Sequence, residues 1–134
     1  MARETSLDDA GRHTDVLIWH LRGYPKATLR LDALGSLTLS VVSYLEILQG
    51  MRNKTELRAV KKMLQRRSAS LLPVTEPITH RATNLMESLT LSHGLQLGDA
   101  LVAATALEHG LAVLTGNSKH FSVVPGLMVE AFAP

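Results

Sequence analysis

The stretch LGDALVAATALEHGLAVLTGNSKHF, residues 97–121, decides the fold of this chain. Its first half is rich in alanine and leucine and predicts a helix, with Asp99 near the start and Gly110 at the end. The four apolar residues at 111–114 then predict a short buried strand. A helix that leads into a buried strand across one glycine is expected in a protein that alternates the two kinds of element.

Polar side chains follow this predicted strand, because Thr115, Asn117 and Lys119 lie in the loop beyond its end. In open parallel sheets, ligands bind in the crevice outside the carboxyl ends of the strands. Asp99 and Asn117 are therefore the first candidates for chemistry. The structural alternative is that Asp99 caps its helix and that Asn117 serves a left-handed turn.

Apolar strands and amphipathic helices alternate through the rest of the chain. Strands are predicted at residues 37–40, 70–74 and 127–132. Helices are predicted at residues 41–51, 55–67 and 77–91, and residues 15–21 fit either a short helix or a strand. This order predicts an α/β fold: a single domain with a mainly parallel central sheet and helices on both faces.

The spacing of apolar residues also predicts which helix faces point inward. In the helix at 41–51 the inward stripe is Val41, Leu45, Leu48 and Met51, and Glu46 lies off it. In the helix at 55–67 the stripe is Leu57, Val60 and Leu64, with Thr55 as the expected cap.

Length and composition narrow the possible classes of protein. The chain has 134 residues, enough for one domain, and no cysteine, so disulfides and thiolate metal sites are excluded. The net charge is only +2, although six cations gather around the helix at 55–67, where we interpret them as a solvated face. No apolar run is long enough for a membrane span or a signal peptide, so we expect a soluble cytoplasmic protein.

Four segments resemble one known family over nearly the whole chain. They are TDVLIWHLRG (14–23), LTLSVVSYLEILQGMR (37–52), LGDALVAATALEHGLAVLTGNSKHF (97–121) and VPGL (124–127). Together they resemble the PIN domain, and specifically toxins of the VapC type. The resemblance implies a metal-dependent endoribonuclease that uses Mg²⁺ or Mn²⁺, is held inactive by an antitoxin of the VapB type, and forms a homodimer.

The resemblance also implies roles for particular residues. Glu46 and Asp99 match acidic residues of the family, Asn117 stands where the family has Asp or Asn, and Asp15 belongs to the first matched block. The implied catalytic residues are Glu46, Asp99, Asn117 and Asp15. Of these, Glu46, Asp99 and Asp15 are the implied metal ligands, and the implied substrate-binding residues are Thr115 and Lys119. Oxygen ligands suit a hard divalent cation, which lowers the pKa of a coordinated water and polarises a phosphate.

The sequence departs from the family pattern near its N-terminus. A first strand normally ends in an Asp, but His13 stands there, followed by Thr14 and Asp15. The preceding SLDDAGR lacks the apolar run of a central strand, so the first strand is expected to be atypical or missing. We interpret residues 1–12 as an atypical leader and residues 13–134 as the PIN-like domain.

Three outcomes for the metal site remain open after this departure. Asp15 could take the vacant role, Asp8 or Asp9 could fold back toward the site, or the site could be impaired. The alternative function is therefore a catalytically inactive PIN-fold module that keeps its surfaces for an antitoxin or for self-association. A doubly wound domain for a small phosphate ligand is a further alternative, but the chain has no GxGxxG or Walker loop.

Overall fold

The computed structural model describes residues 6–7 and 14–133, and for residues 6, 7, 14 and 15 it describes the backbone alone. The strands are β1 (Ser6–Leu7), β2 (Thr38–Ser40), β3 (Ser70–Leu72), β4 (Val113–Thr115) and β5 (Val129–Ala131). The helices are α1 (Thr14–Leu21), α2 (Pro25–Asp32), α3 (Val41–Gln49), α4 (Lys54–Arg66), α5 (Glu76–His93), α6 (Leu97–His109) and the short 3₁₀ helix η1 (Ser118–His120). No helix within this described part is both long and apolar enough to cross a membrane.

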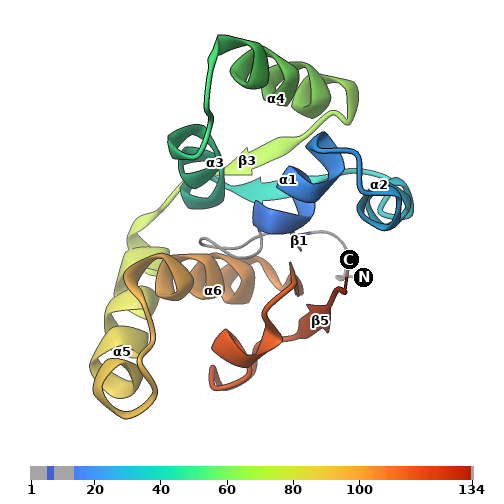
Figure 1. The fold of residues 1–134 in the computed structure, drawn as a ribbon. Helices are drawn as coiled ribbons and strands as arrows, with labels where there is room; N and C mark the ends of the chain where they lie inside the picture. Colours follow the sequence, from blue (N-terminus) through green and yellow to red (C-terminus); the bar gives the residue numbers. More distant parts are fainter. Residues whose placement is uncertain (1–5, 8–13, 134) are drawn as a thin grey trace.

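The five strands form one sheet in the order β3-β2-β1-β4-β5, and every neighbouring pair is parallel (Figure 1). The first strand is therefore present, at the centre of the sheet, but it is atypical because it has only two residues in the described part of the chain. Ladder hydrogen bonds use backbone groups, so a segment without an apolar run can still pair with its neighbours. Ser6 and Leu7 pair in this way although they lie within the segment expected to be a leader.

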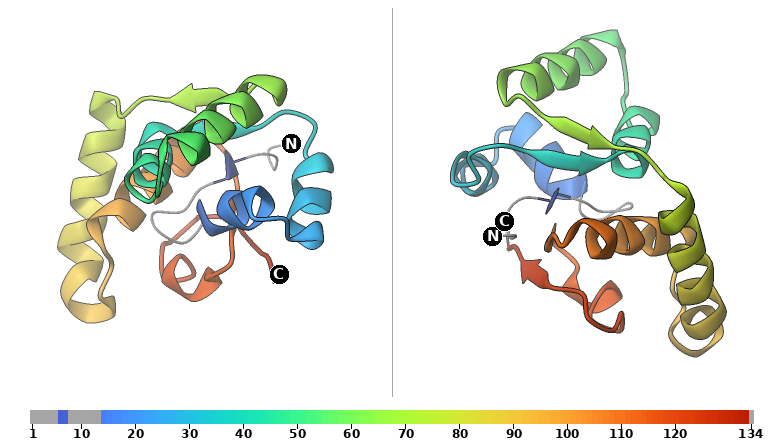
Figure 2. Two further views of the ribbon diagram at one scale, coloured as in Figure 1. Left: turned by 45° about the horizontal axis from the view of Figure 1, so that its top comes forward. Right: turned by 180° about the vertical axis from the view of Figure 1, so that it is seen from behind.

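Two apolar cores lie on opposite faces of the sheet. One core is formed mainly by α5, α6 and the segment around Phe121, and the other by α1, α2, α3 and α4. Within β4, Val113 belongs to the first core and the next residue, Leu114, to the second, because successive side chains of a strand point to opposite faces. The prediction of a sheet with helices on both faces is confirmed. Figure 2 shows α4 and the α5–α6 pair toward opposite ends of this sheet.

The helix that the opening stretch predicts is the most deeply buried helix of the described part. Seven residues of α6 are buried, and four of them are alanines at positions 100, 103, 104 and 106. Small side chains let α6 lie close to both α5 and the sheet. The helix ends at Gly110, whose φ of 64° is left-handed and suits a residue without Cβ.

The predicted inward stripe of α3 is wrong. Leu45 is 55% exposed, and the buried residues of this helix are Ser43 and Ile47. The helix lies between the two cores, because Val42 packs against the first and Ile47 belongs to the second. A helix buried on two sides does not show the single apolar stripe from which the prediction was made.

Two helix starts also differ from the predictions. Asn53, not Thr55, caps α4, and its Oδ1 accepts a hydrogen bond from the backbone N–H of Glu56 at 2.9 Å. The helix α2 was not predicted, because Pro25 suggested a break. Proline at the first position of a helix instead favours its start, since the missing N–H has no partner there in any helix.

Candidate active site

The topology brings three segments to one edge of the sheet. Because β2 and β4 belong to the same parallel sheet, their carboxyl ends, at Ser40 and Thr115, lie at the same edge. Helix α3 begins directly after β2, as Figure 2 shows from behind. Helix α6 leads into β4 through a short turn, so it runs back along the sheet and its first turn lies over the end of β4. This edge is where parallel sheets bind ligands.

Asp99 lies in the first turn of α6 and is completely buried. One carboxylate oxygen, Oδ1, is shielded from solvent, and the other, Oδ2, is 3.4 Å from Nδ1 of His120. A carboxylate accepts hydrogen bonds, so the imidazole donates from Nδ1. Gln96 is the N-cap of α6, and Asp99 is therefore not a capping residue. Burying a charged carboxylate costs free energy, so its position at this edge points to a function.

Thr115 and Asn117 shape the loop that follows β4. Thr115 is fully buried, and its Oγ1 accepts a hydrogen bond from the backbone N–H of Asn117 at 2.8 Å. Asn117 has φ of −133°, so the alternative that it serves a left-handed turn is wrong. The Thr115 hydroxyl thus holds the loop that carries Asn117, and a role of either side chain toward substrate stays a prediction.

Lys119 and His120 follow in η1, and both border a small hollow. The hollow has a volume of about 230 Å³ and is also lined by His93, Leu95 and Val123. Lys119 is exposed and His120 is half-buried, with its imidazole reaching Asp99. A cation at the rim of a hollow next to a buried carboxylate suits the approach of an anionic substrate.

His120 lies at the site but was not among the candidate residues inferred from the sequence. Its contact with Asp99 joins residues that are 21 positions apart, and no local spacing rule predicts such a contact. The available signal was its place three residues after Asn117, in the loop that the sheet edge presents.

Glu46 lies in α3, which packs against the helix that carries Asp99. Its side chain is half-buried, and its Oε1 is shielded from solvent. Among the described side chains, no group of three His, Asp or Glu residues could hold a metal ion. The side chain of Asp15 lies outside the described part of the chain, as do His13, Asp8 and Asp9. The prediction that Glu46, Asp99 and Asp15 hold one ion thus stays a prediction.

The described carboxylates fit a hard divalent cation in their chemistry. Glu46 and Asp99 each keep one carboxylate oxygen away from solvent, on two helices that pack together. Mg²⁺ is commonly bound by only one or two carboxylates and keeps several waters. Two such residues agree in chemistry and number with the protein ligands of a magnesium site, and a third acid would strengthen it.

The chain is similar to known proteins in both sequence and fold. The family model described as PIN domain matches residues 14–127. Ribonuclease VapC10 of Mycobacterium tuberculosis is 42% identical over 114 residues, which cover 81% of this chain and 82% of that protein. A toxin-antitoxin complex from Klebsiella pneumoniae contains a chain that is 25% identical, with a TM-score of 0.74 over 92% of this chain and 96% of that one.

A second solved structure supports the fold alone. DNA-bound VapBC from Salmonella typhimurium contains a chain with a TM-score of 0.80, which matches 99% of this chain and 100% of its own length. The sequence identity is 18%. The whole described architecture, including the central two-residue strand, therefore follows a known arrangement of elements.

Proposed function

This chain belongs to the PIN domain family, and from that premise we propose that it is a VapC-type toxin that hydrolyses phosphodiester bonds of RNA. The observation that carries the proposal is Asp99, a fully buried carboxylate at the ligand-binding edge of a parallel sheet. The 42% identity to a protein named as a ribonuclease supports the same reaction class.

In this proposal Glu46 and Asp99 hold a divalent cation, Mg²⁺ or Mn²⁺, and Asp15 supplies a further carboxylate. A divalent cation held there would polarise the phosphate and lower the pKa of a coordinated water. His120 orients the Asp99 carboxylate through Nδ1, and burial keeps that carboxylate in one geometry. Ordered ligands of this kind reduce the reorganisation that the reaction would otherwise require.

The remaining site residues act on the substrate. Lys119 attracts the phosphate backbone to the hollow that it borders with His120. Asn117 lies on the loop held by Thr115 and presents a neutral side chain to the RNA. The replacement of the usual first Asp by His13 weakens the site, because imidazole is a poor ligand for Mg²⁺. We therefore expect slow cleavage.

The proposed partners are an antitoxin of the VapB type and a second copy of this chain, in the cytoplasm. The toxin-antitoxin complexes among the structural relatives support the first. Leu91 is 98% exposed and Leu97 is 64% exposed, and these residues on α5 and α6 offer apolar surface for a homodimer. Trp19 suits this role less well, because it packs against Phe132 with the ring centroids 5.7 Å apart.

A cleavage assay with the purified chain tests the proposal. Labelled RNA should be cut when Mg²⁺ or Mn²⁺ is added and left intact in EDTA. Asp99→Asn should lower the rate more than about 100-fold, because the carboxylate charge that holds the cation is lost. Asp32→Asn is the matched control, since Asp32 is an exposed carboxylate whose Oδ1 pairs with Arg67.

Each result of this assay has a definite meaning. The control variant should keep its rate within about twofold, as expected for an exposed ion pair. Equal rates for Asp99→Asn and the unmodified chain would overturn the assignment of the site. Cleavage that continues in EDTA would overturn the role of the cation, and intact RNA under all conditions would favour the inactive interaction module.

A further inference from the structure

Helix α4 carries an unusual concentration of positive charge on its exposed face. Lys54, Arg58, Lys62 and Arg66 follow one another at intervals of four residues, and Lys61 lies beside them. Like charges four residues apart repel and destabilise a helix. The acidic residue of this helix, Glu56, is engaged by Arg52 at 2.6 Å, so it does not neutralise the row. A helix that keeps such a row suits a polyanionic partner.

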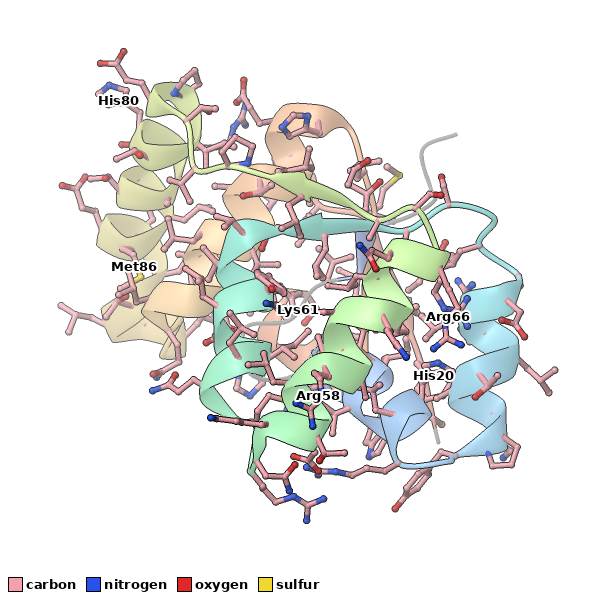
Figure 3. All side chains as sticks on the ribbon, turned by 90° about the horizontal axis from the view of Figure 1, so that it is seen from above. His20, Arg58, Lys61, Arg66, His80 and Met86 are labelled. Atoms are coloured by element: carbon pink, nitrogen blue, oxygen red, sulfur yellow. The ribbon has the colours of Figure 1, made fainter. Side chains whose placement is uncertain are left out.

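The charged face borders a hollow of about 570 Å³ between α4, α3 and the edge strand β3. Arg58, Lys61 and Lys62 supply its cations, and Tyr44 and Leu71 supply an aromatic and an aliphatic surface. Among the described residues that line it, none is acidic. Figure 3 shows Arg58 and Lys61 on α4 in the view from above, with Arg66 near the end of the same helix and His20 on the neighbouring helix α1.

The chemistry of this hollow fits single-stranded nucleic acid. Proteins bind single strands by combining a cationic groove for the phosphates with aromatic side chains on which bases stack. An acidic polypeptide would also be attracted by the cations, but it would leave the half-buried ring of Tyr44 in the wall of the hollow without a matching partner. The concave shape and the aromatic wall therefore favour RNA over an acidic peptide.

The hollow also lies next to the proposed cleavage site along the chain. Tyr44 and Glu46 belong to the same helix, α3, and are two residues apart. Residues two apart on a helix point in different directions, so a strand held on Tyr44 would continue around α3 to reach Glu46.

We propose that Arg58, Lys61, Lys62 and Tyr44 form a docking surface for a single-stranded segment of the RNA substrate, outside the carboxylate site. The cations bind phosphates, and the Tyr44 ring stacks on a base. This inference rests on the proposed function, because it concerns the substrate of that same site. It adds a place outside the carboxylate site where a single-stranded segment of that substrate is held.

A binding experiment tests the surface without cleavage. Fluorescently labelled oligouridylate is titrated with the full chain in EDTA at several salt concentrations. Lys61→Gln combined with Lys62→Gln should lower the affinity about tenfold, and the slope of log affinity against log salt should fall by about 1.4, since each contact to a single strand contributes about 0.7. Tyr44→Leu should lower the affinity about tenfold, whereas Tyr44→Phe should retain it.

A matched control separates the surface from general charge. Lys26→Gln combined with Arg81→Gln removes the same two charges from exposed positions on α2 and α5. This control should leave the affinity within about twofold, because it removes no contact to the strand. Equal weakening by both pairs would overturn the proposal, and so would an unchanged affinity after the Lys61 and Lys62 substitutions.

Two further probes decide between the possible partners. Duplex RNA should bind more weakly than the single strand, because its bases are not free to stack on Tyr44. Polyglutamate that binds through Lys61 and Lys62 while oligouridylate does not would assign the face to an acidic protein and overturn the proposal. A chain that binds through this face but never cuts RNA would contradict the proposed function alone, and a chain that cuts RNA with no dependence on the face would contradict the surface alone.

Discussion

Two charged regions of the molecule differ in burial: the sheet edge around Asp99 holds a buried carboxylate, and the exposed face of α4 holds solvated cations. At the edge, Asp99 is fully buried and reaches His120 through Oδ2. On α4, Lys61 and Lys62 are exposed, and no acid of the described chain pairs with them. A buried charge needs partner groups that are held in place around it, whereas an exposed charge is solvated by water and tolerates replacement. Substitutions near the edge should therefore affect both stability and cleavage, and substitutions of the unpaired cations on α4 should affect binding alone.

The largest expected effect comes from removing the packing behind the edge. Phe121 is fully buried in the core shared with α6, directly after η1. Phe121→Ala should lower the free energy of unfolding by about 3–5 kcal/mol, because it leaves a cavity that a packed core cannot fill. Urea unfolding measures this loss. Arg58→Gln on α4 is the comparison and should change stability by less than about 0.5 kcal/mol. Similar losses for both variants would contradict the contrast between the regions.

The contrast also explains which parts of the molecule the sequence could predict. The helix α6 and the strand β4 were predicted because their burial is local: alanines, a terminal glycine and a short apolar run occur together between residues 97 and 115. Asp99 was predicted as a site residue from its place at a helix start. Its partner His120 became visible only in the structure, because the contact depends on how η1 folds back.

The error on α3 has an equally physical cause. The inward face of this helix was assigned from one stripe, but the helix is covered by both cores and leaves Leu45 exposed. The central strand β1 was expected to be atypical or missing because its segment lacks an apolar run; it is present and atypical, because backbone pairing needs no particular side chains. In both places tertiary contacts, and not local pattern, decide the structure.

The second prediction sharpens the role of His120 as a positioning residue. His120→Leu removes the Nδ1 donor from Asp99 and should raise the Mg²⁺ concentration for half-maximal cleavage about 10- to 100-fold. His120→Asn places an amide N–H near the same position and should restore much of the affinity. An unchanged metal requirement in His120→Leu would contradict this role. His80→Leu is the control, because its imidazole is exposed on α5.

The third prediction concerns the departure at residue 13. His13→Asp should raise the Mg²⁺-dependent cleavage rate by up to about tenfold, because it restores an oxygen ligand for a hard cation. Asp15→Ala is informative in the same assay. If His13→Asp changes nothing and Asp15→Ala abolishes cleavage, Asp15 already holds the ion, and the expected weakness of the site is wrong.

The smallest expected effect lies at the start of α4, where charge is exposed but paired. Hydrogen bonds from the side chain and the backbone N–H of Arg52 lower the pKa of Glu56 to about 2, from 4.5. Because the folded-state pKa is below the unfolded one, this pair stabilises the fold above pH 4.5, and the contribution is lost as the pH falls toward 2. Glu56→Gln should therefore lower the melting temperature slightly at pH 7 and not at pH 2, and high salt should reduce the difference.

Glu87→Gln serves as the control, since Glu87 is exposed on α5 and forms no ion pair among the described residues. An equal shift in both variants, or a shift for Glu56→Gln that persists at pH 2, would mean that the Arg52 contact does not stabilise the helix start.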